Sequence, residues 1–580
     1  MATTLAPPTP TMTATGPNMA AIPAPAASPA PTIDRATLLQ RLHTLLGPGA
    51  VLTQRGDLLV YDSDGTHEHA LPDIVVLPAT TQQVSEIVKL AAAAGMPVVP
   101  RGAGTGLAGG ATPVRGGIVV ALTRMTAIRS VDYANRRAVV EPGVINLHLS
   151  QATMPHGYYY APDPASQKAS TIGGNVATNA GGPHCLAYGV TANHVLGLEV
   201  VLPDGRVINT GGVVSDMPGY DLTGVTVGSE GTTGIVTGIT VRLLRTPENV
   251  RVFLAIFDSI EAASTTVGNI IAAGMIPGAL EIMDGPGCKA VEAAYHVGFP
   301  DDGTSVALLI EIDGLSEGMD ELSDRVTRIA NEAGARSVRV AASQEERDGL
   351  WAGRKGALGA MGRLAPNYYL QDSVVPRTKL PKILNYVYEV AKDYKLVTAN
   401  MFHAGDGNLH PLLLFDRREK GSIERVLEAA NEMTRACIEA GGAISGEHGV
   451  GFEKRKAMSI AFTTEDLVAM AKLKRSFDPF DHFNPEKIFP ASQGCGEIRE
   501  LKETAIPANY GKMAEPRPDR VGLAHGPDCG CGDCQPRTPK GNYAGGAPVG
   551  NVDSRSTSSA HEHATTPAEV DDISVPQAGN

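Results

Sequence analysis

The chain has 580 residues, a formal net charge of −13 and a hydrophobic content of 43%. This length predicts more than one domain, and the acidic charge argues against nucleic acid and anionic membrane surfaces as partners. No apolar run reaches the roughly 18 residues of a transmembrane helix, and the seven cysteines do not form the pattern of a disulfide framework. We therefore expect a protein of a reducing compartment, the cytoplasm.

The N-terminal region predicts two kinds of structure. Residues 1–33 contain eight prolines and no charged side chain, and they lack the basic and apolar regions of a secretory signal, so we expect a disordered extension. Residues 34–69 predict a helical lead-in, because leucines recur on one helical face, at Leu38, Leu39, Leu42, Leu45 and Leu46.

Residues 70–246 predict an α+β domain. Thr80 and Gln83 are spaced as a capping box in front of a helix, and Pro203-Asp-Gly205 predicts a turn between two strands. The strand-like segments are 74–77, 98–99, 118–122, 137–141, 196–202 and 235–244.

Glycine-rich stretches interrupt this domain at three places. Five glycines occur between Gly102 and Gly110, which predicts a loop whose successive N–H groups form an anion-binding concavity suited to a diphosphate. The pattern from Gly104 to Gly109 also matches a Rossmann fingerprint, but that motif opens a helix, and the segment Ala111–Gly117 that follows here does not predict one. Residues 162–182 and 227–236 are similar stretches, so three loops are expected to wrap one extended ligand that carries phosphate.

Residues 247–490 predict a second α+β domain. Strand-like Val252–Phe257 and Ser305–Ile312 alternate with helix-like Ile260–Ala273 and Leu322–Ala333. Two further helical faces are predicted, one with Ile423, Val426, Leu427, Ala430, Met433 and Cys437, the other with Leu467, Met470, Leu473 and Phe477.

Residues 495–580 are rich in Pro, Gly, Ser and Thr and are expected to be disordered. Within this tail, Cys529, Cys531 and Cys534 have a spacing that could bind zinc or part of an iron–sulfur cluster, with His525 as a fourth ligand. The alternative is a solvated tail that binds no metal.

Two segments of the second domain carry candidate chemistry. His403-Ala-Gly-Asp-Gly-Asn-Leu-His410 and Glu447-His448 place imidazoles and a carboxylate in glycine-punctuated loops. These groups suit a divalent metal with an open coordination position. A single histidine is more often a structural hydrogen-bonding group, but the clustering of these groups favours the metal site.

These motifs together resemble the flavoproteins of the vanillyl-alcohol oxidase type, over roughly residues 38–490. Within that superfamily the chain is most similar to bacterial glycolate oxidase flavin subunits and to D-lactate and D-2-hydroxyglutarate dehydrogenases. The resemblance implies a PCMH-type FAD-binding domain over 70–246 and an FAD-linked oxidase C-terminal (cap) domain with an antiparallel sheet over 247–490. It also implies non-covalent FAD, although His184 and Cys185 are of the residue types that tether flavin in some members.

The resemblance also assigns site residues. His403, His410 and Glu447 correspond to metal ligands, with Zn²⁺ expected and Mn²⁺ or Fe²⁺ compatible with the same set. His448 corresponds to the base, Arg354 to the clamp of the substrate carboxylate, and Asn408 to a substrate contact. The residues expected to bind FAD are Pro100, Arg101, Gly102, Ala103, Gly104, Thr105, Gly106, Pro164, Ser170, Thr171, Gly173, Gly174, Asn175, Ala180, Gly181, Gly182, Tyr188, Glu230, Gly231, Gly234, Ile235, Val236, Asn484 and Lys487.

The function implied is an FAD-dependent dehydrogenase that oxidises glycolate or D-lactate to the 2-oxo acid, by metal-assisted hydride transfer to the flavin. Partners implied are an iron–sulfur subunit and a second flavin-type subunit, through which the protein would associate with a membrane. The segment Pro366–Asp372 holds no cation for a second substrate carboxylate, which favours a monocarboxylate, but Lys355 and Arg363 lie close by in the sequence. The alternatives are a D-2-hydroxyglutarate dehydrogenase and a non-catalytic FAD subunit of a redox complex.

Overall fold

The structure is a computed structural model and describes residues 22–214 and 218–490. The predicted cysteine-containing tail, with His525, Cys529, Cys531 and Cys534, lies outside these residues. Residues 22–33, the described part of the predicted disordered extension, form no helix or strand, and hydrogen bonds join them to Ala93 and Pro479. Among the described residues, no helix combines the length and apolar character that crossing a bilayer requires.

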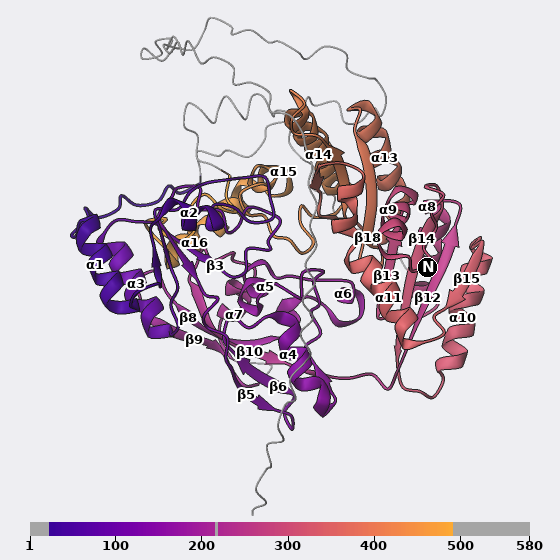
Figure 1. Cartoon of the computed structure of the whole chain (residues 1–580), viewed down its shortest axis with the longest axis horizontal. Helices are drawn as coiled ribbons and strands as arrows, with labels where there is room; N and C mark the ends of the chain where they lie inside the picture. The colour runs from indigo at the N-terminus through magenta and orange to yellow at the C-terminus, as the bar shows by residue number, and fades with distance from the viewer. Residues whose placement is uncertain (1–21, 215–217, 491–580) are drawn as a thin grey trace, which may run out of the picture. The chain divides into compact units, whose positions relative to one another are not determined.

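A four-stranded sheet in the order β1-β2-β4-β3 opens the first half of the chain. β2, β4 and β3 are parallel, whereas β1 pairs antiparallel with β2. Leu38 and Leu42 of α1 pack with Val84 and Ile87 of α3 on one face of this sheet, and the two helices lie side by side in Figure 1. The elements are α1 (Arg35–Leu46), β1 (Val51–Leu52), α2 (Arg55–Leu58), β2 (Ile74–Val76), α3 (Thr81–Ala93), β3 (Val98–Arg101) and β4 (Ile118–Ala121).

A second, antiparallel sheet follows in the order β5-β6-β10-β8-β9. The predicted turn at Pro203–Gly205 joins β8 to β9, with Gly205 at φ +81°. Leu149 of α4 and Ile172 of α5 pack against this sheet. The elements are β5 (Ile128–Asp132), β6 (Arg137–Val140), α4 (Asn146–Thr153), β7 (Tyr158–Tyr159), α5 (Ile172–Thr178), α6 (Cys185–Tyr188), β8 (Val195–Val201), β9 (Val207–Gly211), α7 (Leu222–Thr226), β10 (Ile235–Arg242) and β11 (Leu244–Arg245).

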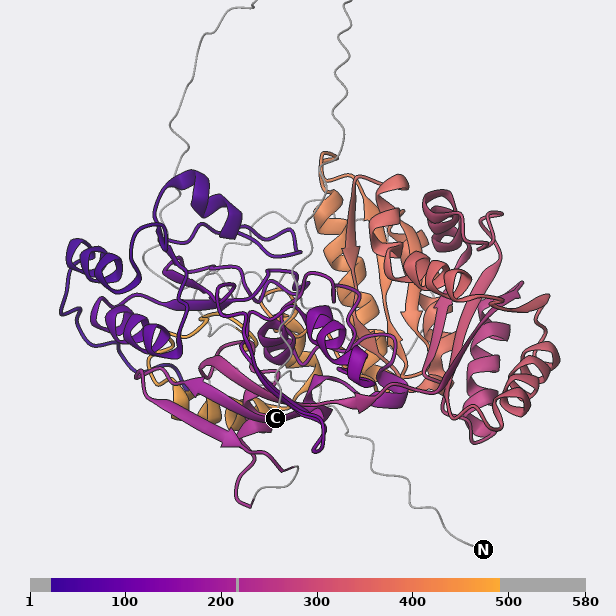
Figure 2. The same cartoon turned by 60° about the horizontal axis from the view of Figure 1, so that its bottom comes forward.

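The second half contains a nine-stranded sheet whose strand pairs are all antiparallel. Side chains alternate between its two faces, as the strand period of two requires. Phe253 and Phe257 of β12 belong to one hydrophobic cluster with α8, α10, α13 and α14, and Leu254 of β12 belongs to another with α9, α11 and α12. Helices therefore cover both faces of this sheet (Figure 2).

The elements of the second half are β12 (Asn249–Phe257), α8 (Ile260–Ala272), β13 (Ala279–Met283), α9 (Gly285–Tyr295), β14 (Val306–Gly314), α10 (Met319–Glu332), β15 (Ser337–Val340), α11 (Gln344–Lys355), α12 (Ala357–Ala360), β16 (Asn367–Leu370), β17 (Ser373–Val374), α13 (Leu380–Asp393), β18 (Val397–His403), β19 (Asn408–Leu409), β20 (Pro411–Phe415), α14 (Ser422–Glu439), α15 (Met458–Ala461) and α16 (Thr464–Phe477). The predicted α+β class is confirmed. After α16 the chain returns to the first half, where Phe483 forms a parallel bridge with Val98 of β3.

Several local predictions are wrong in detail. The Thr80 hydroxyl accepts the Gln83 N–H, but the Gln83 side chain bonds to the N–H of Ala79, so the reciprocal capping box is not closed. The second glycine stretch is not all loop, because α5 lies within it. On α14, Cys437 is buried as predicted, whereas Ile423 and Leu427 are 40% and 42% exposed.

Candidate active site

A cavity of about 370 Å³ is lined by all three glycine stretches and by residues of the second half. Arg354, His403, His410, Glu447 and His448 line it. The expected FAD-binding residues that also line it are Pro100, Arg101, Gly102, Ala103, Gly104, Thr105, Gly106, Pro164, Ser170, Thr171, Gly173, Gly174, Asn175, Ala180, Glu230, Gly231, Gly234, Ile235 and Val236. The structure thus brings most of the residues expected at the flavin together with those expected at the metal.

The glycines of the first stretch allow the backbone of the cavity wall to approach neighbouring side chains closely. A Cβ atom on Gly102 would lie 2.4 Å from the Thr171 hydroxyl, and one on Gly104 would lie 2.1 Å from the Arg101 guanidinium. Gly104 also has φ +74°, which L-residues rarely adopt. Ser170 adds a buried hydroxyl that has no hydrogen-bond partner within the described part of the chain. Glycine walls and an unpartnered donor fit an extended cofactor such as FAD.

Some of the expected FAD-binding residues do not line the cavity within the described part of the chain. Asn484 donates from its side chain to the carbonyl oxygens of Gly110 and Glu230, at 2.8 and 2.7 Å. Lys487 donates to the Thr112 carbonyl at 2.7 Å, and the Tyr188 hydroxyl donates to Asp313. These side chains form hydrogen bonds that connect segments far apart in the sequence. Gly181 and Gly182 are likewise absent from the described lining.

Asn408, the expected substrate contact, also does not line the cavity within the described residues. It is 3% exposed, and a Cβ atom on Gly446 would lie 2.5 Å from its side chain. Asn408 therefore packs beneath the loop that carries Glu447 and His448.

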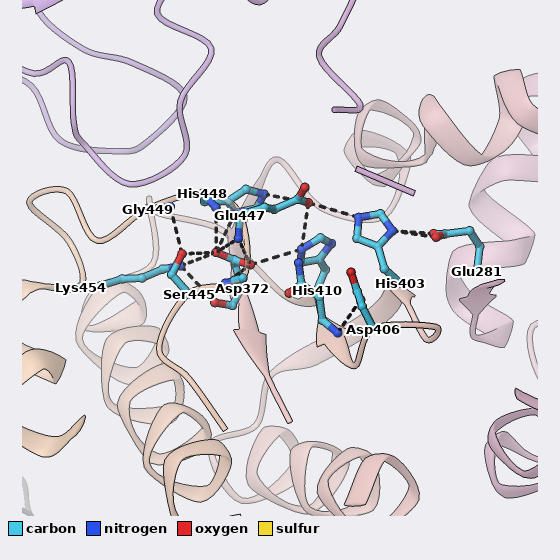
Figure 3. A network of polar contacts seen from close by, with 12 residues as sticks. Glu281, Asp372, His403, Asp406, His410, Ser445, Glu447, His448, Gly449 and Lys454 are labelled. Carbon is cyan, nitrogen blue, oxygen red and sulfur yellow. Dashed lines mark hydrogen bonds and ion pairs between the residues drawn. The ribbon is translucent and has the colours of Figure 1, made fainter. Parts of the chain in front are cut away.

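The expected metal ligands come from three positions in the second half (Figure 3). His403 ends β18, His410 lies between β19 and β20, and Glu447 lies in the loop after α14. Glu447 Oε1 is 3.2 Å from His403 Nε2 and 3.4 Å from His410 Nε2. One ligand atom from each residue falls within 4.8 Å of the others, so the three groups could hold one cation. The Nε2 atom of His410 has no hydrogen-bond partner among the described residues, which fits a metal ligand.

Two buried carboxylates that the sequence did not reveal support this group. Glu281 lies opposite His403 in the β13–β18 pair and accepts from its Nδ1 at 2.7 and 2.9 Å. Asp372, which is fully buried, accepts the backbone N–H groups of Gly446 and His448 at 3.0 Å each. A carboxylate behind a histidine fixes its ring orientation and leaves the other nitrogen for a metal.

Further hydrogen bonds, involving Lys454 and Glu230, fix the loop that carries Glu447 and His448. Lys454 donates to Asp372 Oδ2 at 2.9 Å. Glu230, from the third glycine stretch, accepts the N–H groups of Val450 and Gly451 at 2.7 Å each. The loop is therefore fixed to both halves of the chain.

The ionisable groups of the candidate metal site shift one another's pKa values. Burial alone would raise the pKa of Glu447, but His403 and its neighbours lower it to about 2. Burial would lower the pKa of His403, but Glu281 and Glu447 raise it well above its usual value. Burial and the nearby His410 lower the pKa of His448 to about 4, against the opposing charge of Asp372. A carboxylate pair around one imidazole and a neutral histidine beside them fit a divalent cation and a proton acceptor.

Arg354 lies at the edge of this group. Its side chain is 6% exposed, and its Nη2 atom is 2.5 Å from Glu281 Oε2. Its Nε atom has no hydrogen-bond partner among the described residues, whereas Nη2 forms the ion pair with Glu281. These two atoms form one edge of the guanidinium, a planar pair of donors that suits a carboxylate.

Comparison with known proteins identifies the family of this chain. Residues 72–211 match the family described as "FAD binding domain", and residues 246–488 match "FAD linked oxidases, C-terminal domain". The glycolate oxidase subunit GlcD of Escherichia coli (strain K12) is 42% identical over 84% of this chain and 97% of its own length. A D-lactate dehydrogenase of Anaerostipes hadrus is 33% identical over 74% of this chain and 92% of its own.

The fold has relatives among solved structures as well. A structure of p-cresol methylhydroxylase with bound substrate aligns with a TM-score of 0.67 and 19% identity, covering 79% of this chain and 98% of its own. The expected PCMH-type fold is therefore confirmed. With two matched domains and relatives of this coverage, the chain belongs to the FAD-linked oxidases.

Proposed function

We propose that this protein is an FAD-dependent dehydrogenase that oxidises a small 2-hydroxy monocarboxylate, glycolate or D-lactate, to the 2-oxo acid. The observation that carries the proposal is the shared cavity, in which Arg354 and the group of His403, His410 and Glu447 meet the glycine stretches. The names of the two relatives, a glycolate oxidase subunit and a D-lactate dehydrogenase, support this substrate class.

Each residue has a role in this proposal. Arg354 would bind the substrate carboxylate with two parallel hydrogen bonds and so orient the Cα–H bond. When bound, a divalent metal on His403, His410 and Glu447 would act as a Lewis acid at the substrate hydroxyl, and FAD would accept the hydride. His448 would take the hydroxyl proton, since its imidazole is held neutral. Zn²⁺ is the metal we expect from this set of two histidines and one glutamate.

The cations near the site favour a monocarboxylate. Arg363 is exposed and is absent from the described lining. Lys355 does line the cavity, but its ammonium donates to Asp163 at 2.8 Å. A second substrate carboxylate would therefore be buried without a free partner, which is costly.

A substrate screen tests the proposed function. The purified protein is assayed with an artificial dye as electron acceptor and with glycolate, D-lactate, L-lactate and D-2-hydroxyglutarate as substrates. We expect the highest kcat/KM for glycolate or D-lactate. If D-2-hydroxyglutarate has the highest value, the protein is a D-2-hydroxyglutarate dehydrogenase instead, and if no substrate is oxidised, it is a non-catalytic FAD subunit.

We also propose that the FAD is not covalently attached. The ring of His184 uses both nitrogens in bonds to Asp163 and Glu311, at 2.9 Å each. Burial raises the pKa of the Cys185 thiol well above its usual value, which leaves it unreactive. Acid precipitation should release all the yellow colour, and colour left in the pellet would indicate a tether.

We propose that electrons pass from the reduced FAD to a partner subunit. The relative from Escherichia coli is named as a subunit, which supports a complex in which an iron–sulfur subunit and a second flavin-type subunit accompany this chain. The expected consequence is slow peroxide formation in air compared with dye reduction. Peroxide formed as fast as the dye is reduced would argue for an oxidase that works alone.

A further inference from the structure

A second buried charged network lies next to the candidate active site. Lys355 follows Arg354 on α11 and donates to Asp163 Oδ2 at 2.8 Å. His184 Nδ1 lies 2.9 Å from the same oxygen, and His184 Nε2 lies 2.9 Å from Glu311. The indole N–H of Trp351 donates to the other oxygen of Glu311 at 2.6 Å.

Opposite charges are paired within this network. Burial would lower the pKa of His184, but Asp163 and Glu311 raise it to about 10, so the ring is protonated at neutral pH. Burial would raise the pKa of Asp163, but His184 and Lys355 hold it well below its usual value. Two cations, Lys355 and His184, thus face two carboxylates, Asp163 and Glu311. Lys355 lines the cavity, and its ammonium is paired with Asp163.

Asp163 is well suited to hold Lys355 in place. It lies between Pro162 and Pro164, and proline restricts both its own φ and the backbone of the residue before it. Asp163 is only 9% exposed. Its carboxylate therefore has little freedom to release the ammonium to a ligand.

We propose that Asp163 is a specificity-determining residue, which keeps Lys355 from binding a second substrate carboxylate and so excludes 2-hydroxy diacids. This inference rests on the proposed function, and it names the residue that sets the charge of the substrate. A diacid would have to displace Asp163 from both Lys355 and His184, or else bury its distal carboxylate without a partner.

The test is the substitution Asp163→Asn. Asparagine keeps the shape and can still accept a hydrogen bond from Lys355, but it removes the charge that neutralises the ammonium. We expect the ratio of kcat/KM for D-2-hydroxyglutarate to that for D-lactate to rise about tenfold or more, the scale of one gained charge-assisted hydrogen bond. The double variant Asp163→Asn/Lys355→Met should lose this gain.

Asp313, in β14 beside this network, provides a matched control. Asp313 accepts a hydrogen bond from Tyr188 and is not a hydrogen-bond partner of Lys355. Asp313→Asn removes a nearby carboxylate and should leave the ratio within about threefold. A ratio that is unchanged in Asp163→Asn, or that rises equally in Asp313→Asn, overturns the proposal.

A binding measurement on the holoenzyme separates this inference from the proposed function. Butyrate and glutarate are titrated against the flavin absorbance, which requires no turnover. The wild type should bind glutarate at least about tenfold more weakly than butyrate, and Asp163→Asn should narrow this gap. Wild-type protein that binds glutarate as tightly as butyrate overturns the inference even if the variant does not fold. Failure to oxidise glycolate or D-lactate, with the binding preference as expected, would instead overturn the proposed function alone.

Discussion

Glu281 connects the two chemical groups of the candidate active site. Its carboxylate accepts from His403 Nδ1 and lies 2.5 Å from Arg354 Nη2. The side chain is completely buried. One carboxylate therefore orients both a proposed metal ligand and the proposed carboxylate clamp, and neither can turn without losing it.

The substitution Glu281→Gln tests this role. Glutamine can keep one hydrogen bond, but it removes the charge that raises the basicity of His403. We expect metal affinity to fall about 10–100-fold, the usual effect of losing such a supporting carboxylate, and KM for the substrate to rise as Arg354 loses its ion pair. Metal content after dialysis against a graded chelator measures the first effect. Unchanged metal retention would show that Glu281 has only a packing role.

The metal ligands themselves give a separate prediction. His403→Ala or Glu447→Ala should leave the flavin absorbance intact, since neither side chain belongs to the glycine stretches, but turnover should fall about 10²-fold or more. Dye-coupled kcat and the visible spectrum are measured on the same sample. Full turnover after complete removal of metal from the wild type would rule out a role for metal in the reaction.

At the scale of single residues, the candidate histidines could be picked out from the sequence, but the carboxylate that orients His403 could not. Short glycine-containing segments of the sequence carry the candidate residues His403, His410, Glu447 and His448. Glu281 is far from them in sequence and reaches His403 only through the register of β13 with β18. Pairing registers depend on the packing of the whole sheet, which no local pattern encodes.

At the scale of elements, the first glycine stretch leaves no space for a side chain at Gly104. Gly104 has φ +74°, and a Cβ atom there would overlap the Arg101 guanidinium. We expect Gly104→Ala to shift this loop and to lower the FAD content of the purified protein. The ratio of flavin to protein absorbance measures it.

Gly47 provides the matched control for that experiment. It has a similar φ of +79°, but a Cβ atom there would meet nothing within 4 Å. Gly47→Ala should therefore cost only the backbone strain, about 1 kcal/mol, with FAD content unchanged. Equal loss of FAD in both variants would mean that strain alone, and not the wall of the cavity, is responsible.

The elements also show where local patterns fail. On α14, Val426, Ala430, Met433 and Cys437 are buried in the core, whereas Ile423 and Leu427 are exposed. The glycines of the second stretch suggested a loop, yet Thr171 caps α5 by accepting the Gly174 N–H. Packing of Ile172 and Val176 against the second sheet outweighs the weak helix propensity of glycine there.

At the scale of the molecule, side-chain bonds join the part matched as FAD binding domain to the part matched as oxidase C-terminal domain. His184 bonds to Glu311, Tyr188 to Asp313, and Lys355 to Asp163. The two domains were predicted from their separate patterns. These pairs were not predicted, because no local pattern shows which polar residues of one domain contact those of the other. The cavity is lined by residues of both parts that these contacts join.

The titration of His184 makes this junction sensitive to pH. The pKa of His184 is raised from its usual 6.5 to about 10 in the folded protein. A raised folded pKa stabilises the native state fully below the unfolded value and loses that contribution as pH rises through the folded value. The stability advantage of the wild type over His184→Gln should therefore be largest near pH 6.5 and should shrink steadily toward pH 10.

Melting temperatures of the wild type and the variant, measured at intervals from pH 6.5 to pH 10, give this difference directly. Tyr188→Phe is the control, since it removes another bond of the same junction. Burial and the bond to Asp313 raise the pKa of the Tyr188 hydroxyl well above its usual value, so it does not titrate in this window. Its destabilisation should be constant across the range. A constant difference for His184→Gln as well would mean that the junction is held by hydrogen bonds and packing, and that the charge on His184 contributes nothing to it.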